Sequence, residues 1–186
     1  MKTAIYIGLL GIIYYLAIWV EDINDQTSLK IGGVGKYNQS DLIFASKVIE
    51  DFANIKTVII EPISTNDKTV YRYKEKQLVL DCNALHHKLP FNSFTKRLML
   101  VSSEEFSDGD QKIGGVAFNF DKVAFVSSSS KRLDFKITII HEYCHLLKLK
   151  HCENTKCIMN AAPHSNDAKD LCQSCKDKIN FSKGSI

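Results

Sequence analysis

The sequence predicts an α/β or α+β domain with a mixed sheet, from three observations. The chain has 186 residues, the size of one ordinary domain. Hydrophobic residues make up 45% and charged residues 24%, with only three prolines and nine glycines, which excludes disordered, collagen-like and low-complexity chains. Strand and helix patterns interleave, as in helices packed on a sheet. The formal net charge of +3 gives no indication of nucleic acid, so we expect no such partner.

Residues 1–20 are predicted to be a transmembrane anchor or a signal segment. Residues 4–20 are uncharged and apolar, and as a helix they would span roughly 25 Å. Lys2 precedes this run and acidic residues follow it, which places the rest of the chain on the exported side of a membrane. No small-residue cleavage site is evident, so we expect a membrane-anchored, single-pass protein, with a secreted or periplasmic protein after signal cleavage as the alternative. Residues 21–40, polar with three glycines, are interpreted as a tether.

Residues 41–186 are predicted to be the folded domain, and its first half shows both element types. Apolar residues recur at helical spacing from about residue 41 to 53, after a Ser-Asp pair that can cap the helix. Residues 56–62 predict a strand that Pro62 stops, and 97–103 predict another. Between them, a short strand is expected at 70–73, whereas 77–88 fit either a strand or a helix.

The second half predicts the segments that surround the chemistry. The stretches GGVAFNF and KVAFVSS flank Asp121 and indicate a hairpin or two edge strands, which could receive an extended peptide. A helix is expected from about Asp134, carrying apolar residues as far as Leu147. Short cysteine-rich loops follow, and a last helix is expected near 167–180.

The segment HEYCH at 141–145 indicates a metal site. On a helix, residues four apart share one face, so His141 and His145 can bind one ion. Glu142 lies one step round, within reach of the proton of a metal-bound water. His151 can be the third ligand only if the helix ends soon after the motif and the chain turns back. Three histidines leave one tetrahedral position for water, as in catalytic zinc sites.

Four of the six cysteines follow the last of these histidines closely. Cys152 and Cys157 form one pair and Cys172 and Cys175 another, with spacings that suit a structural zinc site. Four thiolates would make a closed site that fixes loops too short to build a core of their own. The alternative is a pair of disulfides, which an exported location would favour.

The segment HEYCHLLKLKHCENTKCIMN, with the later CQSC, resembles the archaemetzincin (archaelysin) family of zinc metallopeptidases in the metzincin clan. That resemblance implies a metzincin-like mixed sheet with an active-site helix and a zinc-bound C-terminal subdomain. It also implies Glu142 as general base and Met159 as the residue of the Met-turn. The implied metal ligands fall into two sets, His141, His145 and His151 for a catalytic zinc and Cys152, Cys157, Cys172 and Cys175 for a structural zinc.

The chain departs from the family pattern HExxHxxGxxHC at Lys148, which stands at the position of the glycine. Glycine there suits a left-handed turn, and lysine would cost on the order of 1 kcal/mol. The first cysteine pair is also wider by one residue than the family's usual spacing.

These observations predict a zinc-dependent metallopeptidase that hydrolyses peptide bonds in a peptide or protein substrate. The expected chemistry is a zinc-activated water with Glu142 as general base. The expected cofactors are two zinc ions, one catalytic and one structural. A non-catalytic zinc-binding (pseudopeptidase) domain is the alternative, suggested by Lys148, and a disulfide-linked domain with a chance HExxH motif is the third interpretation.

Overall fold

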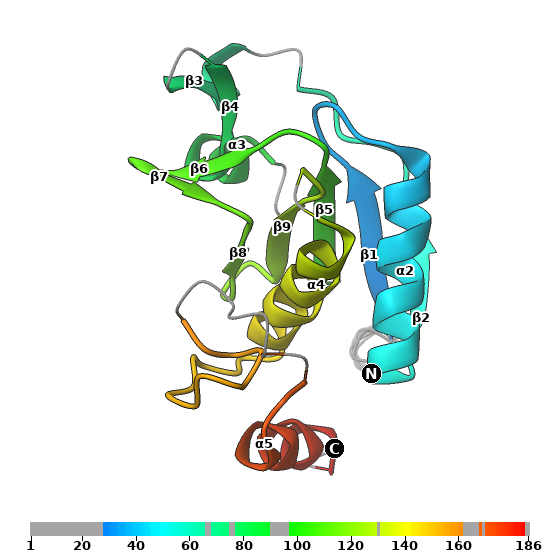
Figure 1. The fold of residues 1–186 in the computed structure, drawn as a ribbon. Coiled ribbons are helices and arrows are strands. Elements are labelled where there is room, and N and C mark those ends of the chain that lie inside the picture. The colour runs from blue at the N-terminus through cyan, green and yellow to red at the C-terminus, as the bar shows by residue number, and fades with distance from the viewer. Residues whose placement is uncertain are drawn as a thin grey trace, which may run out of the picture.

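A five-stranded mixed sheet forms the centre of the fold in the computed structural model (Figure 1). The structure describes residues 28–65, 68–74, 77–89, 97–129, 131–161, 168 and 170–184. The strand order is β2-β1-β5-β9-β8. The bounds of these strands are Ser28–Gly33 for β1, Lys56–Ile59 for β2, Leu98–Ser102 for β5, Gly115–Phe118 for β8 and Val123–Ser127 for β9. The first four strands in that order are parallel, and β8 pairs antiparallel with β9 at one edge.

The central strands β5 and β9 are continuous apolar runs because both of their faces are covered. Met99 and Ala124 belong to one core cluster, whereas Leu100 and Phe125, the next residues along, belong to another on the opposite face. All five residues of β9 are buried. A parallel sheet covered on both sides produces this pattern, in place of the apolar-polar alternation of a half-exposed sheet.

Two long helices cover one face of this sheet. They are α2, Gln39–Ala53, and α4, Arg132–Leu146, and they contact each other as well as the strands. Each helix places apolar residues at helical spacing against the sheet; Leu42, Ala45 and Ile49 are examples in α2. The helix α2 ends at Asn54, whose left-handed backbone (φ 53°) suits asparagine better than most residues.

A second, four-stranded sheet lies beyond the opposite face, in the order β3-β4-β6-β7. Its elements are the 3-10 helix η1, Lys68–Val70, with β3, Tyr71–Lys74, β4, Gln77–Asp81, α3, Cys82–Lys88, β6, Phe106–Asp108, and β7, Gln111–Ile113. The buried side chain of Asp81 caps α3 by accepting a hydrogen bond from the backbone N–H of Ala84. Residues of β4, α3 and β6 share a core cluster with Leu100 and Phe125 of the central sheet.

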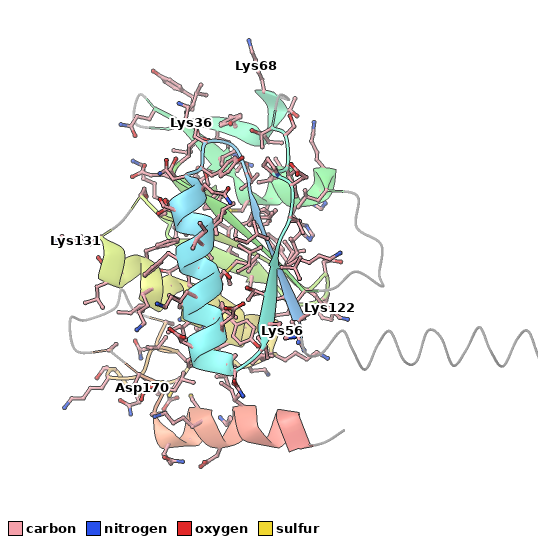
Figure 2. All side chains as sticks on the ribbon, turned by 90° about the vertical axis from the view of Figure 1, so that its right-hand side faces the viewer. Lys36, Lys56, Lys68, Lys122, Lys131 and Asp170 are labelled. Atoms are coloured by element: carbon pink, nitrogen blue, oxygen red, sulfur yellow. The ribbon has the colours of Figure 1, made fainter. Side chains whose placement is uncertain are left out.

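The chain leaves α4 into short loops and finishes in α5, Gln173–Gly184, which lies beyond the end of α4 (Figure 1). Figure 2 views the molecule from the side of α2. Lys36 and Lys68 lie at one end, and Asp170, shortly before α5, lies at the other. Cys157 pairs with Asp170 in an isolated β-bridge, so the cysteine-rich loops occupy the Asp170 end.

The mixed α/β fold confirms the fold class predicted from the sequence, and several segments refine it. Residues 77–88, which fitted a strand or a helix, contain both, as β4 and α3. The interpretation of residues 21–40 as a tether is wrong over residues 28–33. These form β1, which lies inside the sheet with Leu29 and Ile31 fully buried. The segment has two terminal glycines and two polar residues, so its sequence lacks the pattern of a buried strand. It is buried because β2 and β5 flank it.

No helix in the part of the chain that the structure describes is long and apolar enough to cross a membrane. This finding contradicts the predicted transmembrane helix and the membrane-anchored, single-pass localisation, and we withdraw both, together with the secreted alternative that depended on them. The apolar run at residues 4–20, on which these predictions depended, lies outside the described residues.

Candidate metal centres

The helix α4 carries the HExxH segment at its C-terminal end. Tyr143 and Cys144, in the middle of the motif, face the core and are 1% and 0% exposed. Tyr143 lies two positions from each histidine, and residues two apart on a helix do not face each other, so its burial leaves His141 and His145 on another side of α4, where their rings meet the carbonyls of the following loops.

The turn after α4 reverses the chain through Lys148. The N–H of Lys148 donates to the carbonyl of His145 (2.7 Å), and the N–H of Leu149 donates to the carbonyl of Cys144 (3.0 Å). These two bonds define a Schellman motif, in which the residue after the helix cap is left-handed and is usually glycine. Lys148 has φ 65°, the conformation expected of the glycine in the family pattern. The turn forms with lysine in place.

Three imidazole nitrogens converge on one point after this turn. The Nε2 atoms of His141 and His145 lie 3.0 Å apart, and that of His151 lies 3.1 Å from His145 and 3.3 Å from His141. Three ligands of a tetrahedral zinc at the usual bond length of about 2.0–2.1 Å would be about 3.3 Å apart. His141 is buried, His145 is partly buried and His151 is exposed on its loop, so the group is open toward solvent at His151.

Backbone carbonyls orient two of these rings. The Nδ1 of His141 lies 2.8 Å from the carbonyl of Ile158, and the Nδ1 of His145 lies 2.7 Å from the carbonyl of Leu149. A ring that donates through Nδ1 presents the Nε2 lone pair, which is the arrangement of metal-binding histidines. Burial lowers the pKa of His145, although the bond to Leu149 acts in the opposite direction, so the neutral form that binds metals is favoured.

Glu142 lies beside this group with one unpartnered oxygen. Its side chain is 5% exposed, and among the described residues Oε2 has no hydrogen-bond partner. Burial raises the pKa of this carboxyl to about 8. A buried acceptor without a partner is costly in a protein interior, and such atoms usually mark an ion, a water or a catalytic role. The donor set and this oxygen fit a zinc ion with a bound water.

Four thiols form a second group on the loops that follow. The Sγ atoms of Cys152 and Cys172 lie 3.7 Å apart, and those of Cys157 and Cys175 lie 3.8 Å apart. Sulfur ligands of a tetrahedral zinc at about 2.3 Å would be about 3.8 Å apart, whereas a disulfide requires about 2.05 Å. All six cysteines are free thiols, so the structure does not show the disulfide alternative.

The environment of the second group stabilises the thiolate of Cys172, whereas burial raises the pKa of Cys175. The backbone N–H of Cys175 lowers the pKa of Cys172 to about 7, whereas burial raises that of Cys157. The N–H of Cys172 also donates to the sulfur of Cys157 (3.3 Å). Amide donors directed at sulfur stabilise thiolates, which are the ligands that zinc requires.

The structure thus brings together every residue that the sequence predicted for the two sites. Cys152, Cys157, Cys172 and Cys175 form one group and His141, His145 and His151 the other, and each set of ligand atoms lies within 4.8 Å of one another. Met159 is fully buried in the core, one residue after the carbonyl that orients His141.

Sequence reasoning missed the groups that support these residues. The carbonyls of Leu149 and Ile158 carry no signal, because any residue could supply them. The close approach of Gly115 to Glu142 did leave a signal in the sequence, because paired glycines at the start of a strand often mark a place where another group approaches the backbone closely.

Comparison with known proteins by sequence gives a short match. No protein-family model matches the chain. Over 45 residues the chain is 38% identical to the archaemetzincin of Natronomonas pharaonis. The match covers 22% of this chain and 26% of that protein, so the chain spans about a quarter of this curated relative.

Comparison by structure covers most of the chain. The archaemetzincin of Archaeoglobus fulgidus, solved with malonate, matches with a TM-score of 0.66 and 16% identity over 81% of this chain and 99% of that one. The archaemetzincin of Methanopyrus kandleri gives 0.66 and 15% over 84% and 95%. A zinc-dependent peptidase of Methanocorpusculum labreanum gives 0.65 and 17% over 82% and 100%. The chain therefore has the archaemetzincin fold, which confirms the resemblance found in the sequence.

Proposed function

We propose that this chain is a zinc-dependent metallopeptidase that hydrolyses peptide bonds in a peptide or protein substrate. One observation carries the proposal: three Nε2 atoms converge within 3.3 Å, and Glu142, the residue after His141 on the same helix, is buried with an Oε2 that has no partner among the described residues. The solved structures of the same fold include two archaemetzincins and a zinc-dependent peptidase, which supports the same reaction class.

In this proposal His141, His145 and His151 hold the catalytic zinc through Nε2. When bound, zinc supplies a Lewis acid that lowers the pKa of a coordinated water and polarises a carbonyl group. Glu142 then accepts a proton at Oε2 and returns it to the departing amine, as a general base and acid. The carbonyls of Ile158 and Leu149 keep the rings of His141 and His145 in place throughout.

The four cysteines are proposed to hold a structural zinc. Their loops contribute Cys157, Ile158 and Met159 to the main core, but residues 152–161 form only turns, bends and isolated bridges. A closed four-thiolate site would fix these loops against α5, which carries Cys175. The ion would thus stabilise the segment whose Ile158 carbonyl orients His141.

We propose that the substrate backbone binds along the edge strand β8. It pairs only with β9 among the described strands, so its outer edge can accept an extended chain. The N–H of Ser127 donates to the carbonyl of Gly114, which makes 114 a bonded position of this antiparallel pair. The N–H and C=O groups of the alternate residues, Gly115 and Ala117, therefore point to the open edge.

The non-catalytic alternative depended on Lys148 spoiling the turn. The turn forms, and the Nε2 of His151 lies 3.1 Å from that of His145, so no observation favours the alternative over catalysis.

The test is metal analysis of the full chain together with peptide hydrolysis by the wild type and Glu142→Ala. We expect two zinc ions per chain in both proteins and hydrolysis only in the wild type. Two zinc ions without hydrolysis by the wild type would favour the pseudopeptidase, and no zinc would refute both interpretations.

A further inference from the structure

Gly115, the first residue of β8, lies directly against Glu142. A Cβ atom added at Gly115 would lie 2.8 Å from Cγ of Glu142, 2.8 Å from Cγ2 of Thr138 and 2.9 Å from the carbonyl oxygen of Phe125. Carbon atoms in contact normally stay about 3.5–4.0 Å apart. Any side chain at this position would therefore require some of these atoms to move.

The close approach is specific to this glycine. At Gly114, the preceding residue, an added Cβ would lie 3.7 and 3.8 Å from its nearest neighbours, both in Thr138, which is ordinary contact. The two glycines thus form a matched pair, one with room for a methyl group and one without.

The three atoms around Gly115 differ in how easily they can move. Phe125 belongs to β9, which is buried along its whole length between β5 and β8. Thr138 is held on α4 by a hydrogen bond from its hydroxyl to the carbonyl of Asp134 (2.9 Å). For Glu142, one helical turn later, no described residue forms a hydrogen bond with Oε2 that would resist displacement. We therefore expect the Glu142 side chain to move most when a side chain is added at Gly115.

We propose that Gly115 is a positioning residue for Glu142, because the missing side chain lets the edge strand fix the Cγ of the general base by contact. The inference rests on the proposed function. The same peptide unit that faces the open edge of β8 also sets the distance between that edge and Glu142, so one residue would align a bound backbone with the proton acceptor. Misplacing a reacting group by about 1 Å can cost roughly 100-fold in rate.

The kinetic test compares Gly115→Ala with the control Gly114→Ala in the zinc-loaded full chain. We expect Gly115→Ala to lower kcat by about 10- to 100-fold, with KM within about twofold and zinc still at two per chain. Gly114→Ala should stay within about twofold of the wild type. Adding Thr138→Ser to Gly115→Ala removes one clashing methyl group and keeps the hydroxyl bond, so it should restore part of kcat. An unchanged kcat in Gly115→Ala, or an equal loss in Gly114→Ala, would overturn the inference.

A stability test separates this inference from the proposed function, because it needs no activity. Glu142→Ala removes Cγ, so Gly115→Ala should destabilise this variant less than it destabilises the wild type. The free energies of unfolding of the four proteins in that cycle measure the coupling. If Gly115→Ala alone fails to fold while the double variant folds, the coupling is shown in its strongest form. Equal destabilisation in both backgrounds refutes the inference, and a wild type without hydrolytic activity refutes only the proposed function.

Discussion

Replacing Lys148 with glycine is expected to stabilise the protein, although it removes a side chain from a turn next to the proposed active site. Lys148 occupies the left-handed position of the Schellman motif that ends α4, with φ 65°. Its Cβ is crowded in that conformation, whereas glycine adopts it freely. The side chain of Lys148 is exposed, so its loss removes no buried contact.

The expected gain is the difference between two opposing terms. A non-glycine residue in the left-handed region costs roughly 1–2 kcal/mol. Glycine also loses more conformational freedom on folding, which takes back about 0.5–1 kcal/mol. The net gain is therefore about 0.5–1 kcal/mol. For a chain of this length, such a gain raises Tm by about 1–4 °C.

Urea unfolding followed by circular dichroism measures this gain, at one fixed free zinc concentration because bound zinc adds to stability. Lys148→Ala is the matched control. It removes the same charge and the same methylene groups but keeps Cβ and therefore the strain, so it should stay within about 0.5 kcal/mol of the wild type. A second control, Lys150→Gly, introduces glycine at an exposed position where φ is not positive, and it should be neutral or destabilising.

Two results would refute the reasoning. If Lys148→Ala stabilises as much as Lys148→Gly, the effect comes from the charge and not from the backbone. If Lys148→Gly destabilises the protein, the turn depends on the lysine side chain in a way that the geometry does not show.

Three further predictions concern the metal groups and their neighbours. Glu142→Gln should lower kcat by at least about 100-fold and leave two zinc ions per chain by metal analysis; loss of zinc would contradict the general-base role. In metal-free protein, the folded state holds the Glu142 proton up to about pH 8, whereas the unfolded chain releases it near 4.5. Wild-type stability relative to Glu142→Gln should therefore fall, by up to about 1.4 kcal/mol per pH unit, as pH rises between these values, and a flat difference in urea unfolding would refute this. Cys172→Ser should leave one zinc per chain and lower Tm, because a closed four-ligand site loses one ligand; two retained zinc ions would argue against that site.

The sequence predicted those parts of the fold whose local pattern agrees with their final environment. The helix α2 and the strand β5 are examples, because an amphipathic helix and a fully buried parallel strand each have a distinctive pattern. The strand β9 forms the expected hairpin with β8, but it lies inside the sheet and not at its edge. Other elements are held by pairing. The strand β1 ends in two glycines, and a Cβ at Gly33 would lie 2.5 Å from the ring of Tyr37, so a packing requirement put a flexible residue into a buried strand. The strands β6 and β7, three residues each, are too short to produce a pattern.

The candidate site was more predictable than the fold, because metal chemistry restricts both residue type and spacing. HExxH fixes two ligands on one helix face with a carboxylate one step round, and four cysteines in two pairs fix a second group. The position of His151 was predictable only as a condition, that the chain must turn back. The hydrogen bonds at Lys148 and Leu149 meet this condition. The sequence could not show which groups position the site residues. These are the backbone carbonyls of Leu149 and Ile158 and the backbone of Gly115, and none of them depends on a recognisable side chain.

The two metal groups share a single stretch of backbone, and this has an energetic consequence. His151 belongs to one group and Cys152, the next residue, belongs to the other. The N–H of Cys152 donates to the carbonyl of Met159 (2.7 Å), and the preceding residue, Ile158, orients His141 through its own carbonyl. Fixing Cys152 therefore restricts His151 from one side and His141 from the other. An ion held by the thiolates would lower the entropy that the histidine group loses on binding its own ion, and by linkage the converse holds. With both ions bound as proposed, the thiolate site would support the histidine site, which would give a role to four cysteines that have no enzymatic chemistry of their own.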